Sequence, residues 1–319
     1  MKRVLSILAN ILSIKNSCFY FINANFKHRK NIMSIKYAIA SVIFKLIPND
    51  LIPRNIWGDK IWSLRKFLRE HKRLPSNKLI FNDVLFKIKN SDEITDPLRI
   101  FTTDKEFVKL FVKSIVGDKY NVPTIAVLRN ITEIDTFIFP ETCCIKPTQG
   151  CGKVIFRKDN EELDVAQIKD WFKLNYYKPG RERNYKNLKP KIIVEPIIFG
   201  GDPLDYKIFC FNGKPKMIQV DFDRFSSHSR NLYDIHWNEL PFSTKSQKKP
   251  SGLTKPENLN ELLEIAQKLS EYFTFVRIDL YTNSKEIMVG EITHCAENAL
   301  GTFYPSSAEI DASKLIFES

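Results

Sequence analysis

The chain has 319 residues, of which 43% are hydrophobic and 12% aromatic, so it can bury a sizeable core in two or three domains or in one large α/β enzyme. Its formal net charge of +12 at pH 7 indicates an anionic partner, such as a nucleotide, an anionic lipid or an acidic saccharide. Nucleic acid is not expected, because basic and aromatic residues do not interleave and no zinc-ligand spacing occurs.

The first 49 residues are basic and partly apolar. They contain eight Lys or Arg and no Asp or Glu, with apolar runs at 4–14 and 37–47. Each run is shorter than the roughly 20 residues that span a bilayer. A signal peptide fits the opening MKR, but no small-residue cleavage site follows. Two interpretations stay open: a helix lying on an anionic membrane surface, or a helical domain with a solvated basic face.

Helices and short strands alternate through the next part of the chain. Amphipathic spacing predicts helices over 52–75, 104–118 and 161–176, while 79–92 fits a helix or a strand. Strands are expected at 120–130, at 191–199 and twice within 143–158, where a Gly-rich loop joins them. The stretch 178–190 is polar.

Antiparallel strands are expected to dominate the remainder. Asn212-Gly213 is a preferred turn pair and predicts a hairpin over 205–224. Residues 225–250 look polar and irregular. A helix is expected over 256–273, opened by a capping box of Thr254 and Glu257, and two strands follow over 275–293. The pattern is that of an α+β or mixed α/β protein.

A lysine and two glycines stand together in IKPTQGCGK. Lys146 ends an apolar strand, and Gly150 and Gly152 bracket the loop that follows. Glycines let backbone N–H groups approach phosphate oxygens, and the lysine adds a charge. A hairpin with two turn glycines is the alternative.

Two charged residues interrupt apolar strands. Glu195 lies within KIIVEPIIF, either at a strand end beside a flat ligand or on an edge strand facing water. Lys207 shares its strand face with apolar residues, so it should have an anionic partner.

Acidic residues fall on both of the last strands. Arg277 and Asp279 share one face, as do Glu291 and Thr293, and antiparallel pairing would bring Asp279 close to Glu291. Such carboxylates repel each other unless a divalent cation lies between them, and oxygen ligands suit Mg²⁺. Arg277 could neutralise a transferring phosphoryl group. A surface hairpin compensated by Lys and Arg is the alternative.

The order of these motifs resembles that of the ATP-grasp superfamily: TDKEF, IKPTQGCG, VEPII, DYKIF, RIDLY and GEIT. DYKIFCFNGKPK, DFDR and KLSEYFTFVRIDLY are similar to the TupA-like branch of teichuronopeptide and polysaccharide biosynthesis. The resemblance covers roughly 100–310. It implies an α+β, ATP-grasp fold in which two α/β subdomains with antiparallel sheets clasp ATP, preceded by a helical, basic N-terminal region. The expected divisions are 1–75, 76–140, 141–200 and 201–319.

The resemblance also implies roles for particular residues. Lys105 and Lys146, with the loop of Gly150 and Gly152, would contact ATP phosphates. Glu195 to Ile198 would line the adenine pocket, with backbone groups of Pro196 and Ile198 reading the ring edge. Lys207 and Arg277 would hold phosphates in the transition state, and Arg224 would be a further anion binder. Asp279 and Glu291 would bind Mg²⁺. Thr293 stands where many members carry Asn, and its hydroxyl can still bind the ion or hold one of its water ligands.

The implied activity is that of an ATP- and Mg²⁺-dependent ligase that joins a carboxylate and an amine through an acyl phosphate. The expected substrates are an amino acid and an acidic sugar or a lipid- or nucleotide-linked glycan. The six cysteines form no CxxC pair and indicate the reducing cytoplasm, with possible attachment to the inner face of the membrane through residues 1–49.

The residues leave two alternatives to a ligase open. In a glycosyltransferase, Asp279 would hold a metal and a nucleotide sugar, and the Asp-x-Asp pair that many such enzymes use occurs here as Asp221-Phe222-Asp223. A nucleotide-binding module without activity would explain why HCAEN at 294–298 departs from the glycine- and proline-rich stretch expected there.

Overall fold

The computed structural model describes residues 37–42, 44, 46–201, 203–222, 229–244 and 253–318. The chain divides into two compact units, 1–46 and 47–319. In the first unit, residues 37–42, 44 and 46 are helical, whereas the apolar run at 4–14 and most of the basic segment lie outside the described residues. Among the helices that are described, none has the length and apolar character needed to cross a membrane. All elements below belong to the second unit.

A four-stranded antiparallel sheet has the order β1-β4-β2-β3. Its strands are β1 (Ala126–Leu128), β2 (Cys143–Pro147), β3 (Ile155–Arg157) and β4 (Ile192–Glu195). The two short strands joined by the Gly-rich loop are therefore confirmed. The buried side chains of β2 and β4 pack with α7 (Ile131–Thr136), α8 (Val165–Asp170) and Trp171. We call this the small sheet.

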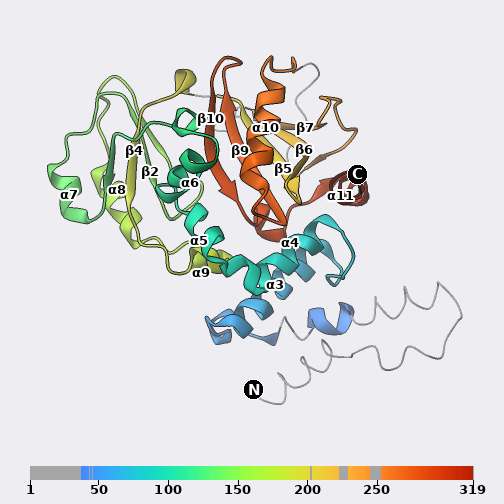
Figure 1. Cartoon of the computed structure of the whole chain (residues 1–319). Coiled ribbons are helices and arrows are strands. Elements are labelled where there is room, and N and C mark those ends of the chain that lie inside the picture. The colour runs from blue at the N-terminus through green and yellow to red at the C-terminus, as the bar shows by residue number, and fades with distance from the viewer. Residues whose placement is uncertain are drawn as a thin grey trace, which may run out of the picture. The chain divides into compact units, whose positions relative to one another are not determined.

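A five-stranded antiparallel sheet, the large sheet, has the order β10-β9-β5-β6-β7. Its strands are β5 (Asp205–Phe211), β6 (Lys214–Phe222), β7 (Ser229–Asp234), β9 (Phe275–Thr282) and β10 (Ile287–Thr293). The predicted β5–β6 hairpin is present, and Asn212 and Gly213 take the positive φ angles of 49° and 72° that its turn requires. Figure 1 shows the large sheet beside the small sheet, with α10 across it.

One face of the large sheet is apolar along its length. Tyr206, Ile208 and Cys210 alternate onto this face and pack with α6 (Phe107–Ile115) and α10 (Leu259–Ser270). Full burial of an aliphatic side chain of this kind contributes about 1.5–3 kcal/mol, so this layer fixes the sheet against the two helices.

The opposite face is divided into an apolar half and a charged half. Phe209, Met217 and Phe275 pack with α4 (Phe81–Asn90) and α11 (Ala308–Phe317). Lys207 and Arg277, two residues from these phenylalanines along their strands, are also buried but lie among carboxylates. Because residues two apart on a strand lie on the same face, the charged side chains share this face with the phenylalanines and lie directly beside them.

The remaining elements support the two sheets. They are α3 (Ile56–His71), α5 (Pro97–Thr103), α9 (Tyr177–Gly180), the short strands β8 (Ser243–Thr244) and β11 (Phe303–Tyr304), and the 3₁₀ turns η1 (Asn49–Leu51), η2 (Asp92–Thr95), η3 (Asp118–Tyr120), η4 (Trp171–Lys173), η5 (Arg183–Tyr185), η6 (Phe199–Gly201) and η7 (Ala296–Ala299). α3, α4 and α9 lie beneath the sheets in the view of Figure 1.

Several sequence expectations need correction. The ambiguous stretch 79–92 is helical, as α4. The range 225–250 was expected to be irregular but contains β7 and β8. The strand pattern was not recognised in the sequence because Arg230 and Asn231 are polar and yet buried. The expected helix over 161–176 is limited to α8 and one 3₁₀ turn.

The predicted capping box at the start of α10 is wrong. The helix begins at Leu259, and its N-cap residue is Asn258 rather than Thr254. The Asn258 side chain donates to Thr282 Oγ1 at 2.9 Å instead of capping the helix. A tertiary contact with β9 has therefore replaced the local cap that the sequence suggested.

Candidate active site

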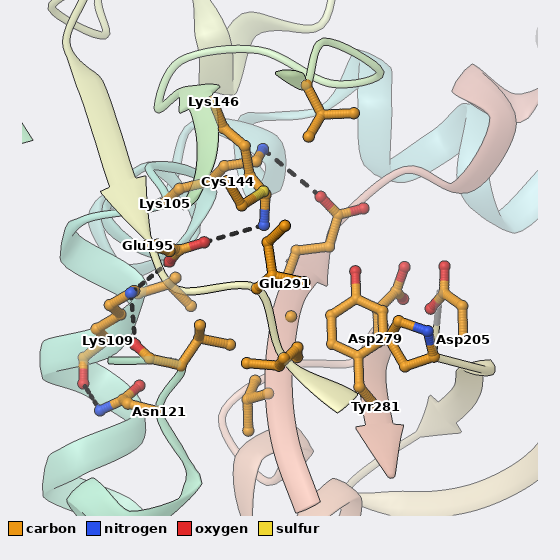
Figure 2. Close-up of a pocket in the computed structure, with 18 of the residues that line it drawn as sticks. Lys105, Lys109, Asn121, Cys144, Lys146, Glu195, Asp205, Asp279, Tyr281 and Glu291 are labelled. Carbon is orange, nitrogen blue, oxygen red and sulfur yellow. Dashed lines mark hydrogen bonds and ion pairs between the residues drawn. The ribbon is translucent and has the colours of Figure 1, made fainter. Parts of the chain in front are cut away.

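A cavity of about 340 Å³ lies between the small sheet and the large sheet. Its walls include Cys144, Lys146, Phe156 and Glu195 from the small sheet, the loop residues Cys151 to Val154, Lys105 and Lys109 from the α6 region, and Asp205, Asp221, Asp279, Tyr281 and Glu291 from the large sheet. Figure 2 shows lysines from one side and carboxylates from the other converging on it. Cations and anions thus meet across a concave space, which is the arrangement of a ligand site.

Glu195 ends the inner strand β4 and is held by two lysines. Lys146 Nζ lies 2.9 Å from its Oε2, and Lys109 Nζ donates to its Oε1 (Figure 2). Burial disfavours the ionised carboxyl, but the charges of Lys146 and Lys109 outweigh this and hold the pKa of Glu195 below its usual value. The alternative of an edge-strand glutamate facing water is wrong, since Glu195 is only 5% exposed.

The hinge after Glu195 continues along the cavity wall. Pro196, Ile197 and Ile198 all line it, as do Val108 and Val112 of α6. An apolar lining of this kind suits a flat heteroaromatic ring.

Lys105 links the two sheets. Its Nζ donates to Gly150 O at 2.6 Å in the Gly-rich loop and lies 3.7 Å from Glu291 Oε2 on β10. The neighbouring Asp104 fixes its backbone, because Asp104 accepts from Thr148 Oγ1 at 3.0 Å and from Lys191 Nζ at 3.0 Å. Lys105 is therefore placed between the loop and the acidic strand.

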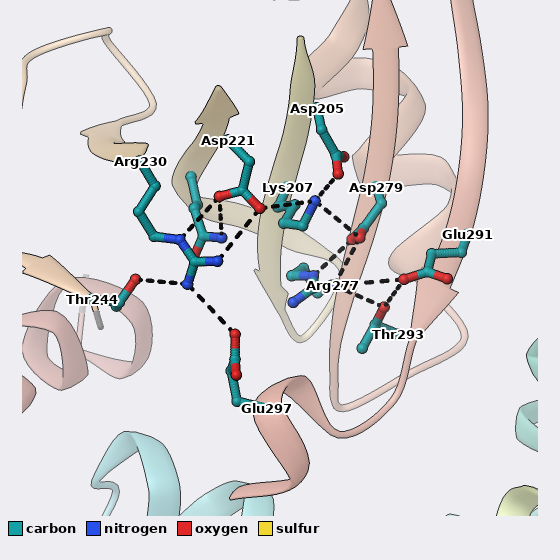
Figure 3. Close-up of polar contacts among 11 residues, drawn as sticks. Asp205, Lys207, Asp221, Arg230, Thr244, Arg277, Asp279, Glu291, Thr293 and Glu297 are labelled. Atoms are coloured by element: carbon teal, nitrogen blue, oxygen red, sulfur yellow. Dashed lines mark hydrogen bonds and ion pairs between the residues drawn. The ribbon is translucent and has the colours of Figure 1, made fainter. Parts of the chain in front are cut away.

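Lys207 lies in the charged half of the large sheet among three aspartates. Its Nζ donates to Asp205 and lies 3.3 Å from Asp221 Oδ2 and 3.7 Å from Asp279 Oδ2 (Figure 3). Burial opposes its charge, yet these carboxylates raise the pKa of Lys207 above its usual value. The expectation that Lys207 has an anionic partner is confirmed.

Arg277 organises the acidic pair beside it. Its Nε and Nη2 atoms donate to the two oxygens of Asp279, each at 2.7 Å, and Nη2 also donates to Thr293 Oγ1 at 3.1 Å. Thr293 Oγ1 in turn donates to Glu291 Oε1 at 3.2 Å (Figure 3). Bidentate pairing of this kind fixes the plane of the Asp279 carboxylate.

The predicted pairing of Asp279 with Glu291 is confirmed by the strand register, and a β-bulge produces it. The register shifts between Val289 and Glu291, which leaves Gly290 opposite the ring of Tyr281. A Cβ atom at position 290 would lie 2.7 Å from Tyr281 Cε2, so only glycine allows this close approach.

The acidic pair fits a magnesium ion by its donor chemistry. Asp279 and Glu291 are cross-strand neighbours whose residues line the cavity. Burial raises the pKa of Asp279, and the Glu291 charge adds to this, although Arg277 and Lys207 act against it. In the described residues no group of three or more His, Cys, Asp or Glu is arranged as a complete metal site. Mg²⁺ suits one or two carboxylates that are completed by waters and substrate phosphates.

The predicted site residues separate into two layers. The residues that line the cavity are Lys105, Lys146, Gly152, Glu195, Pro196, Ile198, Asp279 and Glu291. Lys207, Arg277 and Thr293 lie behind this surface and contact the lining carboxylates, and Gly150 contacts Lys105. Arg224 lies outside the described residues. The metal-ligand role of Thr293 stays a prediction, while its hydrogen bonds place it as a support for Glu291.

Some charged residues of the site were not anticipated. Lys109 contacts Glu195, and its spacing of four residues from Lys105 was the available signal. Asp205, two residues before Lys207 on the same strand, was not recognised as its partner. Arg230 lies 3.0 Å from Asp221 Oδ1 and was missed because β7 was missed.

Two antiparallel sheets lie on either side of a cavity, with lysines on one side and carboxylates on the other, which is the arrangement expected of an ATP-grasp protein. The family model for the TupA-like ATP-grasp proteins matches residues 85–313, and the chain therefore belongs to the TupA-like ATP-grasp family. This confirms the family and the fold that the sequence motifs indicated.

Solved structures of ATP-grasp ligases are similar to the chain at low identity. D-alanine–D-alanine ligase from Bacillus anthracis, complexed with ATP, is 16% identical with a TM-score of 0.38, over 67% of this chain and 62% of that chain. L-amino acid ligase from Bacillus licheniformis is 14% identical with a TM-score of 0.41, over 69% and 51%. The ligase PsnB complexed with minimal precursor, Mg and ADP is 11% identical with a TM-score of 0.36, over 73% and 66%. The chain thus spans less than two thirds of each of these chains. No curated protein matches the sequence.

Proposed function

We propose that the protein is an ATP-dependent carboxylate–amine ligase that acts through an acyl phosphate. The observation that carries this proposal is the cavity in which Lys105 and Lys146 meet Asp279 and Glu291. Membership of the TupA-like ATP-grasp family supports ATP as the nucleotide.

In this proposal the nucleotide lies along the small sheet. The slot formed by Glu195 to Ile198 holds adenine, with backbone groups of Pro196 and Ile198 at the ring edge. Lys105 and Lys146 contact the phosphates, and the loop of Gly150 and Gly152 covers them. The ion pair with Glu195 keeps the Lys146 ammonium group at the cavity wall.

The reaction would take place beside the large sheet. Mg²⁺, when bound by Asp279 and Glu291, supplies charge that neutralises phosphate oxygens. Arg277 keeps the Asp279 carboxylate in place, and Lys207 limits the repulsion among the aspartates around it. Arg277 and Lys207 also add positive charge close to the γ-phosphate.

No side-chain nucleophile is required. The substrate carboxylate oxygen attacks the γ-phosphorus and ADP leaves. The amine then attacks the acyl carbon, phosphate leaves, and the amine gives up a proton as the amide forms. The protein's part is to position the reactants and to balance their charge.

We further propose that the acid is an acidic sugar or a lipid- or nucleotide-linked glycan, and that the amine is an amino acid, in cell-surface polysaccharide biosynthesis. The net charge of +12 and the eight basic residues among positions 1–49 support an anionic partner. The same segment would attach the protein to the inner face of the membrane in the cytoplasm.

A product assay tests the ligase proposal. The protein is incubated with ATP, Mg²⁺, candidate acidic sugars and amino acids, and ADP, phosphate and amide are measured. We expect stoichiometric ADP and phosphate that require both substrates. Release of a nucleoside diphosphate from a nucleotide sugar would instead indicate a glycosyltransferase. Thermal stabilisation by ATP without turnover on any pair would indicate a binding module.

Lys146→Ala is expected to weaken ATP binding about 10- to 100-fold, because a hydrogen bond to a charged group contributes about 1.5–3 kcal/mol. The dissociation constant of a non-hydrolysable ATP analogue, measured by calorimetry, checks this. Lys158→Ala is the matched control, since Lys158 is exposed beyond β3 and the net charge changes equally. An unchanged constant for Lys146→Ala would remove Lys146 from the phosphate site.

A further inference from the structure

An exposed apolar patch lies at the start of α3, apart from the cavity. Leu51, Ile56 and Trp57 are 59%, 38% and 70% exposed, although all three side chains are large and apolar. None of them lines the cavity between the two sheets. Single exposed apolar residues are ordinary on a protein surface, but these three lie within seven consecutive positions, and such a patch often marks an interaction site. We call these three residues the apolar patch.

The backbone that carries the apolar patch is held by close local contacts. The side chain of Asn55 accepts a hydrogen bond from Gly58 N at 3.0 Å and caps α3. A Cβ atom at position 58 would lie only 1.8 Å from Pro53 O, so the chain can approach the helix this closely only over glycine. The exposure of the apolar patch is therefore a fixed feature of the fold.

A buried arginine that follows α9 holds the same segment from the interior. Arg181 donates to Pro53 O at 2.9 Å and to Ile52 O at 3.2 Å, and its Nη1 lies 2.9 Å from Asp59 Oδ1. Tyr177 also donates to the two oxygens of Asp59, at 2.7 and 2.8 Å. The charge of Asp59 is therefore balanced inside the protein, and it does not offset positive charges on the surface outside.

Basic side chains flank the apolar patch. Arg54 and Lys60 are exposed, and the Lys60 ammonium lies 5.5 Å from the centroid of the Trp57 ring. Lys186, which follows η5, is also exposed and donates to Arg54 O at 3.5 Å. Within the described ranges 50–60 and 177–189, the one exposed acidic residue is Asp50, whereas the exposed basic residues are Arg54, Lys60, Lys178, Lys186 and Lys189. The surface around the apolar patch therefore carries net positive charge.

The charge of this surface decides between its possible occupants. Residues 1–49 precede it directly in the chain, but they carry eight basic residues and no acidic one, so they cannot balance its charge. The partner has to be anionic and has to accept tryptophan and aliphatic side chains. An anionic lipid bilayer has both properties, because its phosphates attract Lys and Arg, and apolar side chains enter the boundary between head groups and acyl chains.

We propose that the apolar patch and its flanking basic residues form a membrane-binding surface on the folded unit, separate from residues 1–49. Trp57 and its two aliphatic neighbours enter the head-group region, while Arg54, Lys60 and Lys186 bind the phosphates of anionic lipids. The surface belongs to the unit that also contains the cavity. The inference goes beyond the proposed ligase function and does not depend on it, because none of these residues lines the cavity.

Vesicle binding by the full-length protein tests this surface. Vesicles of phosphatidylcholine, with or without phosphatidylglycerol, contain brominated lipids that quench tryptophan fluorescence on contact. We expect the anionic vesicles to bind at least about tenfold more tightly than the neutral ones and to quench the protein. Trp57→Phe should keep the binding but lose most of the quenching, because phenylalanine still enters the lipid. Trp237→Phe is the matched control and should keep the quenching, since Trp237 stacks on Tyr233 with ring centroids 4.3 Å apart.

A triple variant tests the basic residues. Replacing Arg54, Lys60 and Lys186 by glutamine should weaken binding to the anionic vesicles on the order of 100-fold, since each basic residue near the lipid contributes about 1 kcal/mol. Binding of ADP should be unchanged. The matched control replaces three lysines that are exposed on other elements, namely Lys158, Lys268 and Lys314.

Three results would overturn the proposal: no binding of the unaltered protein to anionic vesicles, equal quenching of the unaltered protein and Trp57→Phe, or equal loss of binding in the two triple variants. Vesicle binding without quenching through Trp57 would assign the lipid contact to another segment and this surface to a soluble acidic partner. ADP binding is measured on the same samples. Its absence would reject the proposed ligase function, whereas vesicle binding alone decides the membrane surface.

Discussion

Asp279→Asn is expected to lower kcat at least about 10²–10³-fold, the loss seen when one group that stabilises transition-state charge is removed. Asparagine keeps the shape of the side chain but removes a negative charge from the proposed Mg²⁺ site, while Arg277 keeps a hydrogen-bond acceptor. Affinity for the adenine end should change little, because Glu195 to Ile198 lie on the other sheet.

The measurement is initial-rate ADP release at saturating ATP, together with the dissociation constant of ADP without Mg²⁺. Glu291→Gln should lower kcat in the same way, since Glu291 is the cross-strand neighbour of Asp279. Asp170→Asn is the matched control, because Asp170 is exposed and pairs with the exposed Lys173. A rate for Asp279→Asn within a factor of two of the unaltered protein would rule out the metal assignment.

Lys207→Met is expected to destabilise the fold by about 3–5 kcal/mol, the cost of breaking a buried ion pair by removing one partner. Lys207 is 4% exposed and contacts Asp205, Asp221 and Asp279, which would be left beside each other with one cation fewer. The midpoint of thermal unfolding should fall by about 4–8 °C, because the entropy of unfolding is about 2.1 cal/mol/K per residue and the chain has 319 residues. Differential scanning calorimetry measures it.

Lys214→Met provides the control, because Lys214 is exposed on the same hairpin. Adding Asp205→Asn to Lys207→Met should restore part of the lost stability, since one negative charge is removed from the cluster of aspartates. A fall of less than about 2 °C for Lys207→Met, with no recovery in the double variant, would show that Lys207 does not balance these aspartates.

Local patterns in the sequence were sufficient for β5, β6, β9 and β10 of the large sheet. The Asn212-Gly213 turn and the alternation of apolar residues gave the β5–β6 hairpin, and the same alternation gave the cross-strand neighbours Asp279 and Glu291. Two-residue periodicity is a property of the strand itself, so it survives without knowledge of the rest of the fold. The same reasoning failed for β7, where Arg230 and Asn231 are polar and buried.

The sequence by itself therefore determined the family, most of the strands and the order of the charged motifs along them. Only the tertiary structure decided which charges from distant parts of the chain meet. Lys109 and Glu195 are separated by 86 residues, and Lys105 and Gly150 by 45, yet each pair is in contact. The physical reason is that periodicity fixes the face on which a side chain lies, whereas the packing of helices and sheets fixes what that face meets.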